Sequence, residues 1–161
     1  MARRSPDGES RLDFVLTLAD PAQPTVTELG TAVPLTPFLL EWNFPETGNT
    51  IETSDMSSSF NKQDAGTYGG DAGTLTAYKD DIPADDDAWT ALPRLTRGFF
   101  VERLFGGGDV AYAADDVVSV YPGVVTARSS QPRQRNTPLQ FTVNVAITGE
   151  PLHDVDVVAG V

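Results

Sequence analysis

The chain has no cysteine and only one histidine in 161 residues. Without cysteine it can form no disulfide and no thiolate metal site, so its fold has to be stabilised by burial of apolar surface. His153 is the one imidazole available for general-base catalysis, and no Gly-x-Ser-x-Gly motif accompanies it. Gly106-Gly-Gly-Asp lacks the Lys-Ser/Thr that completes a phosphate-binding loop. We therefore expect no enzyme activity, no catalytic residue, no metal site and no cofactor.

Basic residues are also scarce. The sequence has 11 Lys and Arg against 23 Asp and Glu, which gives a net charge of −12. Residues 41–87 hold 11 of the acids and only two bases, Lys62 and Lys79. Because proteins bind duplex DNA by neutralising phosphates with clustered Lys and Arg, this balance argues against direct DNA binding.

Long apolar runs are absent as well, since no stretch approaches the roughly 18 to 20 apolar residues of a membrane helix. The opening Met-Ala-Arg-Arg-Ser-Pro-Asp-Gly has no apolar centre resembling that of a signal peptide. We expect a soluble protein that is made in the cytoplasm and contacts no membrane. The length fits a single β-sandwich domain over 11–151, preceded by a flexible arm at 1–10 and followed by a C-terminal arm or edge strand at 152–161.

The clearest pattern present is an alternation of apolar and polar residues over 138–148. Period two over this length predicts a β-strand with one dry face and one wet face, because a helix would scatter the same apolar residues around its axis. The apolar set is Leu139, Phe141, Val143, Val145 and Ile147, and the polar set is Gln140, Thr142, Asn144 and Thr148.

Similar patterns, with 12 Pro and 14 Gly between them, predict a mostly β protein of short antiparallel strands. Residues 20–37 carry four prolines and are expected to have little regular structure, and 45–73 reads as a long polar loop that holds one strand near 51–60. The remaining predicted strands are 11–19, 38–44, 74–79, 96–105 and 117–127, with a weak edge strand at 154–161.

One flanking helix is predicted over 84–92. Asp85 would cap its N-terminus, and Asp86 and Asp87 lie in the first turn, where the helix dipole favours acids. Capping explains these acids better than a calcium site, because the spacing of an Asp-x-Asp-x-Asp-Gly loop is missing. Trp89 is expected to dock the helix on the sheet.

Several segments together resemble a known family. Gly66-Thr-Tyr, Leu75-Thr-Ala-Tyr-Lys-Asp-Asp and Phe141-Thr-Val-Asn-Val-Ala-Ile-Thr-Gly-Glu-Pro occur in the order found in the major tail tube protein of long-tailed, siphovirus-type bacteriophages, here one of an actinobacterial host. The resemblance covers about residues 38–151. It implies an antiparallel β-sandwich or barrel that forms hexameric rings, and these rings stack into a tube for genome delivery.

The resemblance also implies partners and a location. The protein would bind copies of itself and other tail proteins, namely the tape measure, terminator and baseplate proteins, within the virion tail, and genomic DNA would pass without specific binding. Contacts within and between rings would involve the segments 1–10, 45–73 and 152–161. Candidate contact residues in these segments are Arg3, Arg4 and Tyr68.

Two surfaces follow from the residues themselves. In the tube that the resemblance implies, Gln140, Thr142, Asn144 and Thr148, or acids of neighbouring strands, would line the DNA channel, although any half-solvated sheet shows the same alternation. Arg128, Arg133 and Arg135 form a basic cluster that could meet the acidic 41–87 region of a neighbour, or could be a solvated hairpin tip. A tail terminator, a head-tail connector or a monomeric β-sandwich binding module remain alternative functions.

Overall fold

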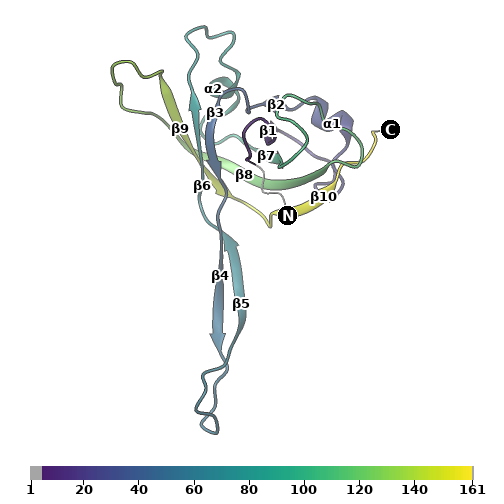
Figure 1. Ribbon diagram of the computed structural model, residues 1–161, viewed down its shortest axis with the longest axis vertical. Helices are drawn as coiled ribbons and strands as arrows, with labels where there is room; N and C mark the ends of the chain where they lie inside the picture. Colours follow the sequence, from purple (N-terminus) through teal and green to yellow (C-terminus); the bar gives the residue numbers. More distant parts are fainter. Residues whose placement is uncertain (1–4, 161) are drawn as a thin grey trace.

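The computed structural model describes residues 5–160, which form one strongly curved antiparallel sheet with a long projecting hairpin (Figure 1). The order of hydrogen-bonded strands in the main sheet is β2-β1-β7-β8-β9-β6-β3, and β10 also pairs with β8. The mostly β, antiparallel class predicted from the sequence is confirmed. The main-sheet strands are β1 (Arg11–Val15), β2 (Val33–Pro34), β3 (Leu39–Asn43), β6 (Gly73–Tyr78), β7 (Arg97–Arg103), β8 (Val117–Ser130), β9 (Gln140–Ile147) and β10 (Leu152–Asp156).

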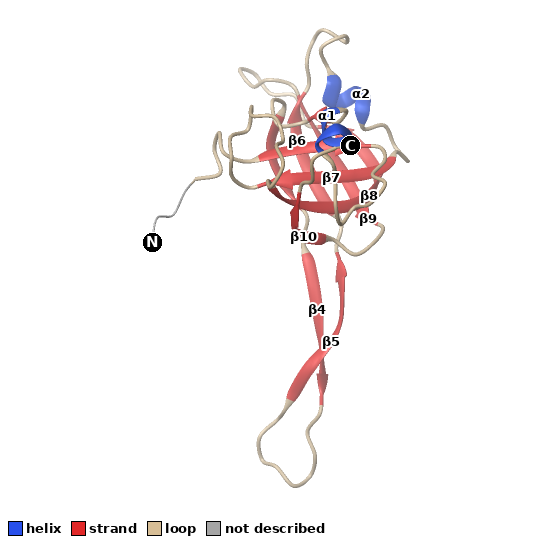
Figure 2. Ribbon diagram, turned by 90° about the vertical axis from the view of Figure 1, so that its right-hand side faces the viewer, coloured by secondary structure: helices blue, strands red, loops and turns tan. Residues whose placement is uncertain are grey.

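The sheet is curled, and its inner face encloses the main core (Figure 2). Phe100 lies at the centre of this core, with the ring of Phe14 at 5.0 Å and that of Phe44 at 5.4 Å. Trp42 on β3 donates its indole N–H to Glu102 on β7 at 2.7 Å, which joins two strands that are far apart in the sheet order. The fold is therefore intermediate between a sandwich and a barrel.

Strand β9 follows its predicted alternation. Phe141, Val143 and Val145 are fully buried in the core, and the residues between them are half-buried. Strand β7 is covered on both faces, because Phe100 belongs to the inner core and Val101 to a second core on the other face. Leu104 and Phe105, which were expected to continue β7, lie beyond its end and are exposed.

The second core lies between the outer face of the sheet and helix α1 (Val26–Gly30). Residues 20–37 were expected to have little regular structure; most of the segment has none, but this helix was not predicted. Thr25 caps the helix by accepting from the N–H of Glu28, while the Glu28 carboxylate accepts from the N–H of Thr25. The Thr-x-x-Glu spacing of such a capping box was present in the sequence as a signal.

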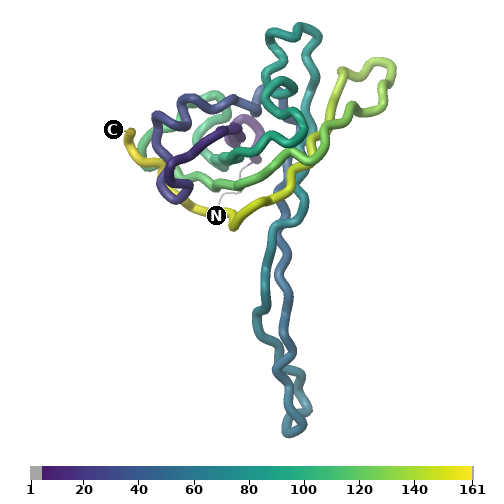
Figure 3. Tube along the Cα trace, turned by 180° about the vertical axis from the view of Figure 1, so that it is seen from behind, coloured from purple at the N-terminus to yellow at the C-terminus, as the bar shows by residue number. Residues whose placement is uncertain are grey.

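Residues 45–73 form a two-stranded hairpin of β4 (Glu46–Glu52) and β5 (Gln63–Gly70), which extends far from the body (Figure 3). The predicted strand at 51–60 was therefore placed too late, and the predicted loop at 63–70 is a strand. Every residue of β4 is exposed, and so is every residue of β5 except the half-buried Gly66. With no apolar face to bury, these strands gave no alternating pattern to detect.

Helix α2 (Asp87–Ala91) is shorter than the predicted 84–92, and its N-cap is Asp86 rather than Asp85. Asp86 makes no side-chain capping bond and instead pairs with Lys79 at 3.1 Å. Trp89 docks the helix as expected, with its ring edge-on to Phe141 at 5.0 Å. With α1 there are two short helices in the part of the chain that the structure describes, where one was predicted, and neither is long and apolar enough to cross a membrane.

Candidate assembly surfaces

Strands β3, β6, β9 and the C-terminal half of β8 share an outer face that no core cluster covers; we call it the polar face. The register places Glu41, Thr76, Thr142 and Ser129 side by side in one row across the four strands. The next row is Asn43, Thr74, Asn144 and Ala127. All these side chains are exposed or half-buried, and Glu41 is the one charged group among them. The polar face is thus broad and nearly neutral in a chain of charge −12.

Three of the four residues predicted for a channel lining lie on the polar face. Gln140, Thr142 and Asn144 point outward from β9, opposite Tyr78, Thr76 and Thr74 of β6. Thr148 follows the end of β9 and is exposed, and its N–H donates to the carbonyl of Pro122. The neighbours on β6 were not singled out from the sequence, although Thr74-Leu-Thr-Ala-Tyr alternates in the same way.

The four strands of the polar face end in two free edges. Strand β3 pairs with β6 on one side and with no other strand of residues 5–160. On the far side of the face, β8 runs past the end of its pairing with β7, which stops at Val124. Such edges carry backbone N–H and C=O groups that a strand or loop of another subunit can satisfy.

The β4–β5 hairpin is fixed to the body at its base. His153 on β10 lies 3.1 Å from the Glu46 carboxylate, and the Tyr68 hydroxyl donates to Glu150. A Cβ on Gly70 would lie 2.9 Å from Ile147, so the base packs closely against the end of β9. Tyr68 was predicted as an inter-subunit contact, and its side chain is exposed even though its hydroxyl donates to Glu150. The hairpin is therefore anchored at one end and solvated along its length.

The predicted arginine cluster divides into two parts. Arg128 stacks on the Trp89 ring, 3.6 Å from its centroid, and donates to the Trp89 carbonyl, so it stabilises the docking of α2. Arg133 and Arg135 are exposed in the loop between β8 and β9, at the opposite end of the molecule from the hairpin tip (Figure 1). Arg3 and Arg4 lie outside the described residues.

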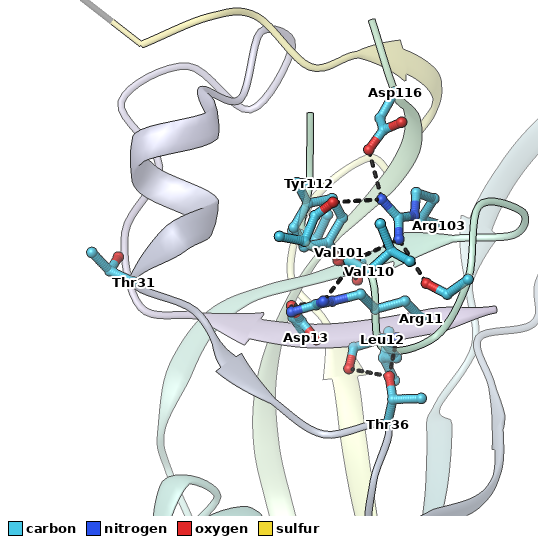
Figure 4. Close-up of polar contacts among 12 residues, drawn as sticks. Arg11, Leu12, Asp13, Thr31, Thr36, Val101, Arg103, Val110, Tyr112 and Asp116 are labelled. Atoms are coloured by element: carbon cyan, nitrogen blue, oxygen red, sulfur yellow. Dashed lines mark hydrogen bonds and ion pairs between the residues drawn. The ribbon is translucent and has the colours of Figure 1, made fainter. Parts of the chain in front are cut away.

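A buried ionic cluster holds the loop that follows β7 (Figure 4). The Arg103 guanidinium is buried, and it donates to Asp116 at 2.6 Å and to the carbonyls of Gly107 and Val110 at 2.7 Å. Arg11 reaches the same loop through the Val110 carbonyl at 2.8 Å. The residues before β1 are tied to this loop too, because the Gly108 N–H donates to the carbonyl of Gly8. One arginine therefore fixes a glycine-rich segment that has little regular structure.

Two carboxyl groups of this cluster respond to pH in opposite directions. Burial raises the pKa of Asp13 above its ordinary value, even though Arg11 pairs with it at 2.7 Å. Its contribution to stability is therefore lost as the pH rises through the folded-state pKa. Burial would raise the pKa of Asp116 also, but the Ala113 N–H and Arg103 outweigh it, and the net shift is downward. Its contribution is lost instead as the pH falls through the folded-state pKa.

The structure places the one histidine of the chain, His153, beside two polar side chains. His153 lies between Glu46 and Ser119, and its contact with the serine hydroxyl is long, at 3.4 Å. Burial, together with the charge of Glu102, raises the pKa of Tyr121 to about 12, so this hydroxyl stays protonated and donates to Glu102 at neutral pH. Within residues 5–160 no group of three or more His, Cys, Asp or Glu side chains is placed to hold a metal ion.

A family model described as phage tail tube protein matches residues 1–160 of this chain. The chain belongs to the phage tail tube protein family. It is a structural tail tube protein of the virion, which confirms the family resemblance and the structural role inferred from the sequence. No curated protein matches it.

Solved structures with a similar fold come from phage-like particles. The tail of an empty gene transfer agent particle, refined with C6 symmetry, and the virion of the native particle each contain a chain that is 11% identical, with a TM-score of 0.54. Each match covers 94% of the tail tube protein and 98% of the other chain. A chain of the six-fold symmetrised baseplate of the anti-feeding prophage has a TM-score of 0.58 at 10% identity. This match covers 95% of the tail tube protein and 98% of the other chain. At these identities the likeness shows the fold.

Proposed function

We propose that this tail tube protein closes into six-membered rings that stack into a hollow tube, with the polar face lining the channel. The observation that carries the proposal is the polar face itself, a nearly uncharged surface bounded by two free edges. DNA slides best past a wall that neither binds nor strongly repels phosphate. Hydroxyl and amide groups such as those of Thr142 and Asn144 meet this requirement.

The two free edges explain how one subunit meets the next. A contact between different surfaces of identical chains is heterologous. Such contacts close into a ring when the rotation from one subunit to the next is a whole-number fraction of 360°. Joining the β3 edge of one subunit to the β8 edge of the next would continue the polar face around the ring. The C6 and six-fold symmetries stated for two of the similar structures support a ring of six.

Stacking would use the long axis of the molecule. The hairpin tip, residues 52–64, carries Glu52, Asp55 and Asp64 against a single base, Lys62. The loop with Arg133 and Arg135 lies at the other end, so rings placed head to tail bring opposite charges together. A contact of this kind repeats without closing, which is how a tube grows.

The remaining expectations concern partners and setting. A tube needs proteins that set its length and cap its ends, so we propose contacts with tape measure, terminator and baseplate proteins, and assembly in the host cytoplasm without enzymatic activity. The actinobacterial host stays a prediction. A tail terminator or connector would stop at one ring, and a monomeric binding module would form none. The projecting hairpin favours stacking, because it extends far beyond the body of the subunit and exposes Met56 and Phe60 at a tip that an adjacent ring could bury (Figure 1).

Placing positive charge on the polar face tests the channel directly. In the double variant Thr142→Lys and Asn144→Lys, assembled tubes are expected to retain short duplex DNA in a salt-dependent way, because each ring then carries twelve added cations if it has six subunits. Co-sedimentation of labelled DNA with tubes measures this retention. Gln23→Lys with Thr31→Lys, on exposed residues around α1, is the matched control. Equal DNA retention by the two variants would contradict the channel assignment.

A further inference from the structure

Leu95 has a strained backbone conformation and an exposed side chain. Its φ is 72°, a left-handed value that is unfavourable for a bulky residue, and its side chain is 65% exposed. The Leu95 N–H donates to the Val125 carbonyl at 2.8 Å, and Arg94 donates to the Thr126 carbonyl at 3.1 Å, so the strained turn is held against β8. Arg94 and Arg97 on either side are exposed as well. We call residues 94–97 the knob.

The hydrogen bonds to β8 explain the backbone of this turn, but they do not explain a leucine side chain at its exposed position. Burial of a leucine side chain can offset the free-energy cost of an unfavourable backbone conformation, but Leu95 buries little of its side chain. Local strain that the surrounding structure maintains without a folding benefit is typical of residues that bind something. A surface that binds the knob would need an apolar recess for Leu95 and acidic side chains around it for Arg94 and Arg97.

Such a recess lies beside the free edge of β3. A groove of about 550 Å³ opens between β3, the end of β7 and the residues before β1, and no Lys or Arg of residues 5–160 lines it. Its apolar surface comes from Leu40, Trp42 and Leu104, of which the two leucines are exposed. Its acids are Asp7, Glu41 and Glu102; Glu102 is held by Trp42, whereas Asp7 and Glu41 are exposed.

The knob and the groove lie at opposite edges of the polar face and at a similar level along its strands. The row that begins at Asn43 beside the groove ends at Ala127 on β8. Arg94 contacts Thr126, the residue before Ala127, and Leu95 contacts Val125. If the β8 edge of one subunit lies beside the β3 edge of its neighbour, with these rows aligned, the knob of the first subunit lies within one or two residues of the groove of the second.

We propose that the knob of one subunit seats in the groove of its neighbour in the same ring, with Leu95 on Leu40 and Leu104 and the arginines on Asp7 and Glu41. The proposal rests on the ring-forming function above and specifies the residues that join its subunits. The occupant is a second copy of this chain, because the charges are complementary and both features flank free edges of one sheet. Knob into groove is heterologous, as ring closure requires.

Leu95→Gly separates this role from a role in folding. Glycine adopts positive φ without penalty, so the melting temperature of the unassembled subunit is expected to rise by about 2 °C. The protein concentration needed for assembly, measured by sedimentation, is expected to rise at least tenfold. Leu16→Gly is the control, since Leu16 is also 65% exposed and should leave this concentration within about twofold. A Leu95→Gly variant that assembles as readily as the wild type would overturn the proposal.

Cysteine pairs identify the occupant, because the chain has no cysteine of its own. Under mild oxidation at concentrations where the wild type forms rings or tubes, Leu95→Cys with Leu104→Cys should give a ladder of disulfide-linked oligomers, and neither single variant should do so. If Met56→Cys with Leu104→Cys gives the ladder instead, the hairpin tip fills the groove and the knob assignment is wrong. Wild-type protein that forms neither rings nor tubes would overturn the proposed function itself, whereas tubes without the Leu95 ladder overturn only the knob.

Discussion

Replacing residues 50–66 with an Asn-Gly turn is expected to abolish stacking of rings into tubes and to leave the subunit folded. The deletion joins Asn49 to Thr67 through a two-residue hairpin turn of a favoured type. Contacts at the base, between His153 and Glu46 and between Tyr68 and Glu150, are retained. Since the removed segment adds no side chain to either core, the melting temperature should stay within about 3 °C of the wild type. Electron microscopy should show single rings or unassembled subunits.

A smaller change tests whether the tip of the hairpin makes this contact. Met56 and Phe60 are the two large apolar side chains of the tip, and both are strongly exposed. Met56→Ser with Phe60→Ser should weaken stacking without affecting ring formation, because exposed apolar groups contribute only when a partner buries them. Tubes of normal length from the variant with the shortened hairpin would show that stacking uses another surface.

Arg103→Ala is expected to be the most destabilising single substitution. It removes a buried guanidinium and with it one hydrogen bond each to Asp116 and to the carbonyls of Gly107 and Val110. Each of these acceptors keeps one other donor, respectively the N–H groups of Ala113 and Val110 and the Arg11 guanidinium. Losing a large buried side chain together with hydrogen bonds to a charged group costs about 2 to 5 kcal/mol. Urea unfolding of the unassembled subunit measures the loss. Arg133→Ala removes an exposed arginine and should change the unfolding free energy by at most about 0.5 kcal/mol.

The pH profile distinguishes loss of this ion pair from loss of packing. In the wild type, part of the stability depends on ionised Asp116 and is lost as the pH falls through its lowered pKa. Arg103→Ala should flatten that acid limb, because Asp116 then loses its cationic partner. Arg103→Lys keeps the charge but cannot reach three acceptors at once, so it should be intermediate in stability. Equal stability of Arg103→Ala and Arg133→Ala would show that the cluster does not hold the loop.

The sequence predicted the elements that bury one face. In β9 the alternation of Phe141, Val143 and Val145 with polar residues reports burial on one side, and the structure places these three side chains in the core. The hairpin strands β4 and β5 bury neither face, so the hydrophobic pattern carried no information about them. Helix α1 was missed because the prolines on either side of it, such as Pro24 and Pro34, were given more weight than the Thr25-x-x-Glu28 capping signal.

The candidate surfaces divide in the same way. Gln140, Thr142 and Asn144 were predictable as one polar row because a single strand carries them. Their neighbours on β3, β6 and β8 depend on pairing between residues distant in sequence, which one strand does not reveal. The groove combines side chains from before β1, from β3 and from the end of β7, so it exists only after the sheet has curled.

Cryo-electron microscopy of tubes assembled from the purified chain tests the central claim most directly. We predict a hollow tube of stacked six-membered rings in which Gln140, Thr142 and Asn144 face the channel and the β4–β5 hairpin spans adjacent rings. A tube with the polar face on its outer surface, or a chain that stays monomeric at every concentration and salt condition tested, would contradict the account.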